Sequence, residues 1–189
     1  MSSLMDSDLG RASREETHEI RTRVLCLGNE LLADDSLGFL AADHIREFAP
    51  EDVEVISTPE SGFHLLDYVL GIRRLVVVDT VVTGTSPPGT IYKFHDDELK
   101  TVPGGSPHYV GLCETLALAR QLRLPVAEEV VFLAVEAADC STIGGSMHSA
   151  VQAALPQLVD VVRDLLLEKA ERRVERGHTL LATEFGLKK

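Results

Sequence analysis

Residues 22–38 have the sequence TRVLCLGNELLADDSLG and contain the turn that decides the fold. The apolar run at residues 24–27 ends in Gly28-Asn29, which predicts a short buried strand over residues 22–28 that enters a tight turn. Residues 36–49 follow with apolar side chains at helical spacing and predict an amphipathic helix. A strand, a tight turn and a helix in direct succession are typical of the first unit of an α/β fold.

The same alternation continues along the chain. The segment LVVVD at residues 75–79 is the clearest buried parallel strand, and further strands are expected over residues 53–57, 90–95 and 130–136. Helices are expected over residues 62–70, 111–121 and 146–176. The last helix has Ser146 as its candidate N-cap and contains Pro156, which should kink or split it.

The link GTSPPG at residues 84–89 is too short to hold a crossover helix, so the strand at residues 90–95 is expected to be antiparallel to its neighbours. We therefore expect a three-layer α/β/α sandwich with a twisted, mostly parallel sheet of about five strands, one of them antiparallel. Residues 22–176 should form this single domain, after a polar N-terminal extension at residues 1–21 and before a C-terminal tail at residues 177–189.

Composition excludes several classes of function. The formal net charge of −12 argues against nucleic acid as a partner, because a polyanion would be repelled over most of the surface. The polar N-terminus lacks the apolar segment of a signal peptide, and the apolar stretches are far too short to span a bilayer. Three cysteines without a CxxC pair predict neither a disulfide framework nor a cysteine zinc site. A cytoplasmic protein without a membrane partner is expected.

Candidate functional residues follow the predicted strands, where ligands bind in open α/β sheets. The first strand leads into Asn29 and the acids Asp34 and Asp35, Asp79 closes the LVVV run, and His108 precedes the helix at residues 111–121. Two carboxylates and an imidazole at one edge of the sheet would suit a divalent ion such as nickel or zinc.

Each of these residues also has a purely structural interpretation. Asp34 and Asp35 precede a helix, where acids commonly cap free N–H groups, and Asp79 could cap the turn that follows its strand. His108 could be an ordinary surface histidine. Cys140 could be a nucleophile, although an inert thiol fits its surroundings in the sequence better. The sequence contains no GxGxxG, P-loop or GxSxG motif, which leaves dinucleotide, P-loop and serine-hydrolase chemistry unsupported.

The ordered combination of Gly28-Asn29, Leu32, Asp34-Asp35 and Gly38, then Val78-Asp79, then Pro107-His108 resembles the [NiFe]-hydrogenase maturation endopeptidases. The resemblance spans about residues 24–166. It implies an α/β/α domain that removes a C-terminal peptide from the hydrogenase large-subunit precursor once nickel has been inserted. It also implies a metal site formed by two acids and one histidine.

By matching motif positions, the resemblance assigns the metal site to Asp35, Asp79 and His108, with Asp35 and Asp79 also the catalytic candidates. Asn29, Asp34 and Gly38 take supporting positions. The nickel would be carried by the substrate, and other divalent ions could substitute for it. Cys26 and Ser36 stand where many members of the family have glycine.

Three functions are compatible with these residues. The first is the maturation endopeptidase, by an aspartic-type or a metal-assisted route. The second is a chaperone that senses nickel in the same precursor without cutting it. The third is a peptidase of similar fold that acts on another protein, as do the spore-protein peptidases.

Overall fold

The computed structural model describes residues 20–96 and 107–184 of the chain, and the side chains of residues 20–96 and 111–168. Within this part, five strands form one sheet in the order β2-β1-β3-β5-β4. The first four of these are parallel and comprise β1 (Thr22–Leu27), β2 (Val53–Thr58), β3 (Arg74–Val81) and β5 (Glu129–Glu136). Strand β4 (Ile91–His95) pairs antiparallel with β5, which confirms the predicted mixed sheet.

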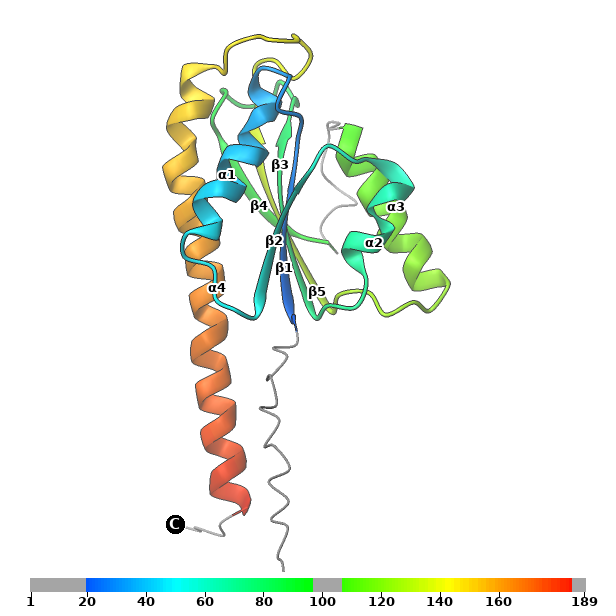
Figure 1. Ribbon diagram of the computed structural model, residues 1–189, viewed down its shortest axis with the longest axis vertical. Coiled ribbons are helices and arrows are strands. Elements are labelled where there is room, and N and C mark those ends of the chain that lie inside the picture. The colour runs from blue at the N-terminus through cyan, green and yellow to red at the C-terminus, as the bar shows by residue number, and fades with distance from the viewer. Residues whose placement is uncertain (1–19, 97–106, 185–189) are drawn as a thin grey trace, which may run out of the picture.

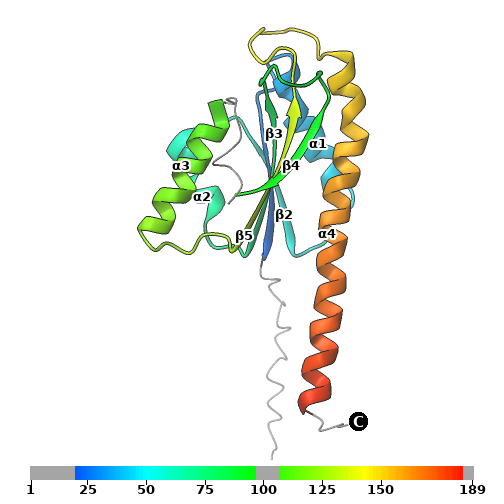
Figure 2. The ribbon, with the colours of Figure 1, turned by 180° about the vertical axis from the view of Figure 1, so that it is seen from behind.

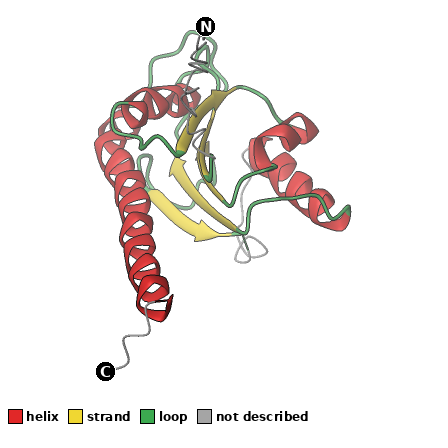
Figure 3. Cartoon of the chain, turned by 60° about the horizontal axis from the view of Figure 1, so that its bottom comes forward, coloured by secondary structure: helices red, strands yellow, loops and turns green. Residues whose placement is uncertain are grey.

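Helices cover both faces of the sheet (Figures 1 and 2). Helices α1 (Leu37–Arg46) and α4 (Ser149–Glu184) lie on one face. The 3-10 turn η2 (Gly62–Leu65), the short helix α2 (Leu66–Val69) and helix α3 (Pro107–Gln121) lie on the other. Figure 3 shows the same layers from a tilted direction. The predicted α/β/α sandwich is therefore confirmed.

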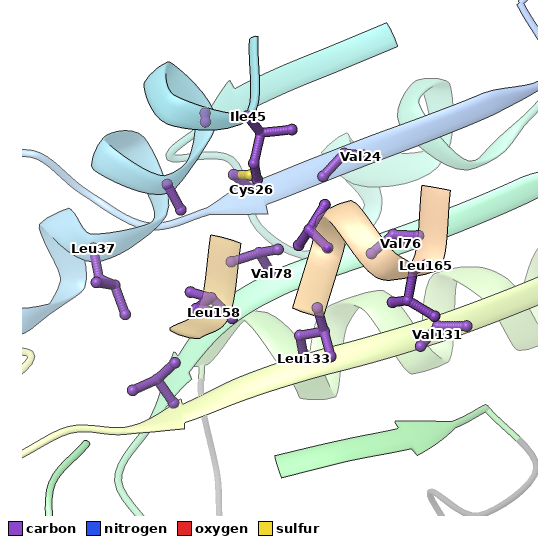
Figure 4. Close-up of a cluster of buried hydrophobic side chains, with 14 of the residues drawn as sticks. Val24, Cys26, Leu37, Ile45, Val76, Val78, Val131, Leu133, Leu158 and Leu165 are labelled. Atoms are coloured by element: carbon purple, nitrogen blue, oxygen red, sulfur yellow. The ribbon is translucent and has the colours of Figure 1, made fainter. Parts of the chain in front are cut away.

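Each face of the sheet has its own apolar core because successive strand residues point to opposite sides. Val24, Val76 and Val78 face α1 and α4, where they meet side chains such as Ile45 and Leu158 (Figure 4). The alternate residues of the same strands face α2 and α3 and form the second cluster, which includes Leu25, Leu27, Leu75, Val77 and Phe132. Because β1, β3 and β5 are covered on both sides, the central residues of these strands are mostly apolar.

The predicted termini of the domain are only partly described. Of the expected extension at residues 1–21, Ile20 and Arg21 lie within the described part and lead into β1. At the other end, α4 continues to Glu184, so the predicted boundary between residues 176 and 177 falls inside a helix. No helix in the described part of the chain is long and apolar enough to cross a membrane.

The predicted start of α4 is wrong, and the helix is not split. The helix begins at Ser149, where the N–H of Ala150 donates to Nδ1 of His148 and the N–H of Gln152 donates to the His148 carbonyl, so His148 takes the capping position expected for Ser146. Pro156 does not split the helix. Its ring is exposed, and the carbonyl of Gln152 that it leaves without a helical partner belongs to an exposed residue that water can reach.

Replacing Pro156 with alanine should stabilise the protein. The substitution restores one helical hydrogen bond and removes the clash of the proline ring with the preceding turn, so we expect a gain of about 1–3 kcal/mol in the free energy of unfolding. Urea denaturation followed by circular dichroism measures the gain. The exposed neighbour Gln157, changed to alanine, is the control and should shift stability by less than about 0.5 kcal/mol. A less stable Pro156→Ala variant would contradict this account.

Candidate functional site

The four parallel strands end at one edge of the sheet, which we call the carboxyl edge (upper end in Figure 1). The β1–α1 connection and the β5–α4 connection both lie there, and helix α1 starts from it. Ligands of open α/β sheets bind at such an edge because the loops that follow parallel strands converge on it.

Two glycines allow the β1–α1 connection to lie tightly against the end of β1. A Cβ atom on Gly38 would lie 2.0 Å from the carbonyl oxygen of Leu27, and a Cβ on Gly28 would lie 2.1 Å from the carbonyl oxygen of Asp35. Neither position can hold a larger residue unless the backbone moves. The close approach sets the position of the 3-10 turn η1 (Asp34–Ser36), which carries both acids.

Asn29 shapes the turn between these glycines. Its side-chain Oδ1 accepts a hydrogen bond from the N–H of Leu31, and its own N–H donates to the carbonyl of Asp35. An asparagine that bonds the backbone two residues onward forms an Asx turn. The predicted supporting residue Asn29 therefore stabilises the loop at its base.

The buried carboxylate of Asp34 joins two loops that are distant in the sequence. Its Oδ2 accepts hydrogen bonds from the N–H groups of Ala138 (2.8 Å) and Asp139 (2.9 Å), and its Oδ1 accepts one from the N–H of His148 (2.6 Å). A buried charge of this kind is tolerated because each oxygen has donors. Asp34 thus fixes the β5–α4 connection and the start of α4 against the β1–α1 connection.

Asp35 and Asp79 meet through a residue that the sequence did not single out, Thr80. The Thr80 hydroxyl donates to Oδ1 of Asp35 at 2.7 Å, and the Thr80 N–H donates to Oδ1 of Asp79, also at 2.7 Å. All three residues are buried, with Asp79 fully so. The structure therefore brings the two predicted acids to one place, although they come from η1 and β3.

Asp79 lies inside β3 and not after it, because the strand continues to Val81. The alternation along β3 places Thr80 with Val76 and Val78 on the face covered by α1 and α4. Asp79 follows Leu75 and Val77 and so takes the face covered by α3. Thr80 therefore lies on the side of α1, next to Asp35, while Asp79 lies on the side of the helix that carries His108.

His108 is the second residue of α3, and its side chain lies outside the described residues. The helix itself is held in place about two turns further on, where the Thr115 hydroxyl donates to the carbonyl of Gly62 at 3.0 Å. Gly62 opens η2, the segment that follows β2. Figure 1 shows the start of α3 towards the same end of the molecule as the carboxyl edge.

Cys140 is close to the acids but is not set up as a nucleophile. Its thiol donates to the Thr80 hydroxyl at 3.5 Å. The pKa of Cys140 is raised to about 11, chiefly by burial; the Thr80 hydrogen bond lowers it, and the nearby charges of Asp35, Asp34 and Asp79 raise it. A thiol with this pKa stays protonated at neutral pH, in agreement with the interpretation of Cys140 as inert.

A fourth buried acid, Glu136, was missed although it follows an apolar run in β5 as Asp79 does in β3. It accepts hydrogen bonds from the N–H groups of Thr83 and Gly84 and from the hydroxyls of Thr83 and Tyr92. Burial alone would raise the pKa of Glu136, but these donors together outweigh it and lower that pKa below the ordinary value. Glu136 anchors the β3–β4 connection.

Cys26 and Ser36, which the resemblance marks as departures, have structural contacts here. Cys26 lies in the core beneath α1, and burial raises the pKa of its thiol to about 12. The hydroxyl of Ser36 donates to the carbonyl of Ala33 at 2.7 Å.

The carboxyl edge thus presents two buried acids, Asp35 and Asp79, that could bind a cation or activate water. Among the side chains described, no three His, Cys, Asp or Glu residues come together as a metal site. A third protein ligand would have to come from elsewhere, and His108 on α3 is the one that the sequence predicts.

The chain is similar to known proteins over most of its length. Residues 41–165 match the model of the hydrogenase maturation protease family. The hydrogenase expression/formation protein HoxM of Cupriavidus necator is 30% identical over 164 residues, which are 84% of this chain and 80% of HoxM. The hydrogenase 2 maturation protease of Escherichia coli is 30% identical over 105 residues, or 53% of this chain and 64% of that protein.

Solved structures show the same architecture. The hydrogenase maturating endopeptidase HybD from Escherichia coli has a TM-score of 0.70 at 24% identity, covering 79% of this chain and 93% of that one. The [NiFe] hydrogenase maturation protease HybD from Thermococcus kodakarensis has a TM-score of 0.61 at 25% identity, covering 77% and 99%. These similarities confirm the resemblance drawn from the sequence and the predicted fold.

Replacing Asp34 with asparagine should destabilise the protein strongly. The amide would put an NH₂ group opposite backbone N–H donors, so we expect a loss of about 2–4 kcal/mol in the free energy of unfolding, measured by urea denaturation. The exposed Asp43, which pairs with Arg46, is the matched control, and Asp43→Asn should cost less than about 0.5 kcal/mol. Equal stability of the two variants would show that the Asp34 hydrogen bonds contribute little.

Glu136 should make stability depend on pH. Because its pKa is lower in the folded protein, its contribution is complete above the unfolded value of about 4.5 and is lost as the pH falls below that value. At pH 7 we expect Glu136→Gln to cost about 1–3 kcal/mol, since the amide cannot accept from all four donors. Urea denaturation at pH 7, 5, 4 and 3.5 should show the gap between variant and wild type narrowing on acidification. A gap that stays constant would contradict the assignment.

Proposed function

The chain belongs to the hydrogenase maturation protease family, and we propose on this basis that it removes a C-terminal peptide from the nickel-loaded large subunit of a [NiFe] hydrogenase. The observation that carries the proposal is the pair of buried acids, Asp35 and Asp79, linked through Thr80 at the carboxyl edge of the family's fold. The partner is the large-subunit precursor, and the reaction takes place in the cytoplasm.

We further propose that nickel reaches the site as part of the substrate. Asp35, Asp79 and His108 would contact the ion that the precursor already holds. Two carboxylates and one imidazole suit a borderline divalent ion, and other divalent ions could substitute for nickel. Asp79 lies on the face of β3 that α3 covers, which supports a role beside His108 at the start of that helix. Recognition of the bound ion would restrict cleavage to a precursor whose metal has been inserted.

The chain's own residues would then position and activate the reactants. Docking on the ion holds the scissile peptide near the two carboxylates, and proximity of this kind supplies a large part of the reduction in the barrier. Asp35 or Asp79 would accept a proton from the attacking water as general base. In the alternative, metal-assisted route, the ion polarises the scissile carbonyl and the acids only hold the ion.

A digest of the precursor tests the proposed function. Nickel-loaded precursor should lose its C-terminal peptide on incubation with the protein, as detected by mass spectrometry of the large subunit, whereas nickel-free precursor should remain intact. Binding without shortening would indicate the nickel-sensing chaperone instead. Failure to bind or cut the precursor, with cleavage of another protein, would indicate a peptidase with a different substrate.

Substitutions at the site should abolish cleavage without unfolding the protein. We expect His108→Ala and Asp79→Asn each to lower the rate of processing by roughly 100-fold or more, because each removes a group that contacts the ion or the reacting water. His44 on the exposed face of α1 and the exposed Asp43 are the matched controls, and His44→Ala and Asp43→Asn should process at the wild-type rate. Full processing by His108→Ala would remove that residue from the site.

A further inference from the structure

We propose that Thr80 is a positioning residue that sets the orientation of the Asp35 carboxylate relative to Asp79. The inference rests on the proposed function and adds to it a residue that the family resemblance did not assign. It depends on three contacts that meet at one side chain and its backbone: the bonds to Asp35 and Asp79 and the bond from Cys140.

One residue supplies hydrogen bonds to both acids. The Thr80 hydroxyl donates to Asp35 and the Thr80 N–H donates to Asp79, each at 2.7 Å. Thr80 is 1% exposed, and Asp35 and Asp79 are 4% and 0% exposed, so these bonds form where little water competes. The distance and angle between the two carboxylates therefore depend on residue 80.

The hydroxyl can hold a carboxylate in place because its own position is fixed. Threonine is branched at Cβ and its χ1 angle is restricted, and here the residue lies in the paired strand β3, opposite Val135 of β5. A carboxylate, in contrast, turns about its last bond over a broad range. The bond from a rigid, buried hydroxyl limits that rotation at Asp35.

Cys140 adds a second contact to the Thr80 hydroxyl. The hydroxyl donates to Asp35, because a carboxylate only accepts, and the Cys140 thiol donates to Oγ1 of Thr80. The raised pKa of Cys140 keeps the thiol protonated at neutral pH and preserves it as a donor. In the series of hydrogen bonds from Cys140 through Thr80 to Asp35, each group therefore donates to the next.

The two acids depend on different parts of Thr80, and this makes the proposal testable. The bond to Asp79 comes from the main chain and survives any substitution except proline, whereas the bond to Asp35 comes from the side chain. Thr80→Ala therefore removes the hydroxyl bond to Asp35 and keeps the main-chain bond to Asp79. Thr80→Ser restores the hydroxyl and serves as the rescue variant.

The experiment measures kcat and KM for processing of nickel-loaded precursor by wild type, Thr80→Ala and Thr80→Ser, with the thermal midpoint of each protein recorded in parallel. We expect Thr80→Ala to lower kcat by about tenfold or more with KM within about twofold, because the substrate still docks but one acid is misaligned. Thr80→Ser should return kcat to within about threefold of wild type. Thr90→Ala, which removes the Thr90 hydroxyl bond to the Pro87 carbonyl in the β3–β4 connection, is the matched control and should be unchanged.

Three results would overturn the proposal. Wild-type kcat in Thr80→Ala would show that Asp35 needs no hydroxyl, and an equal loss of kcat in the alanine and serine variants would show that the methyl group matters and the hydroxyl does not. A rise in KM with unchanged kcat would point to substrate binding instead. If Thr80→Ala lacks the native circular dichroism spectrum, Thr80→Val replaces it, since valine retains the branched shape. If the wild type itself does not cleave the precursor, the proposed function is refuted. This outcome differs from the three results above, in all of which the wild type cleaves.

Discussion

The site depends on the close approach of α1 to the end of β1. Gly38 lies so near the carbonyl of Leu27 that a single added carbon would collide with it, and Gly28 has the same relation to Asp35. This contact fixes η1 over the end of β3, which places Asp35 within reach of Thr80. If α1 began further from the strand, Asp35 would lie out of reach of the Thr80 hydroxyl.

The four buried acids of the carboxyl edge divide into two kinds by their partners. Asp34 and Glu136 accept three and four hydrogen bonds from backbone and side-chain donors, and each holds a connection in place. Asp35 and Asp79 are each bonded by Thr80, one through its side chain and one through its main chain. Asp34 and Glu136 thus hold connections of the carboxyl edge in place, whereas Asp35 and Asp79 are linked to each other through Thr80. Burial of a carboxylate alone indicates neither role.

Periodicity in the sequence was enough to predict the layers of the fold. The short link at residues 84–89 predicted that the strand at residues 90–95 is antiparallel, and the position of Asp35 and Asp79 after apolar runs predicted the edge at which they meet. The contacts of Asp34 could not be predicted, because its partners are backbone amides more than 100 residues away, and every residue except proline carries such an amide. Thr80 directly follows the predicted strand at residues 75–79, and nothing in the sequence distinguished it from a residue of the apolar core. The split expected at Pro156 does not occur. The sequence pattern does not show whether water can reach the carbonyl that loses its helical hydrogen bond to the proline.

The use of main-chain donors by Asp34 has an evolutionary consequence for the β5–α4 connection. Ala138, Asp139 and His148 contribute their N–H groups to Asp34, so those three bonds make no demand on side-chain identity anywhere between residues 138 and 148, apart from excluding proline at the bonded positions. Exposed positions such as Ile143 are therefore open to mutational drift while the loop keeps its course. The exposed surface of this connection can thus change without rebuilding the acids beneath it.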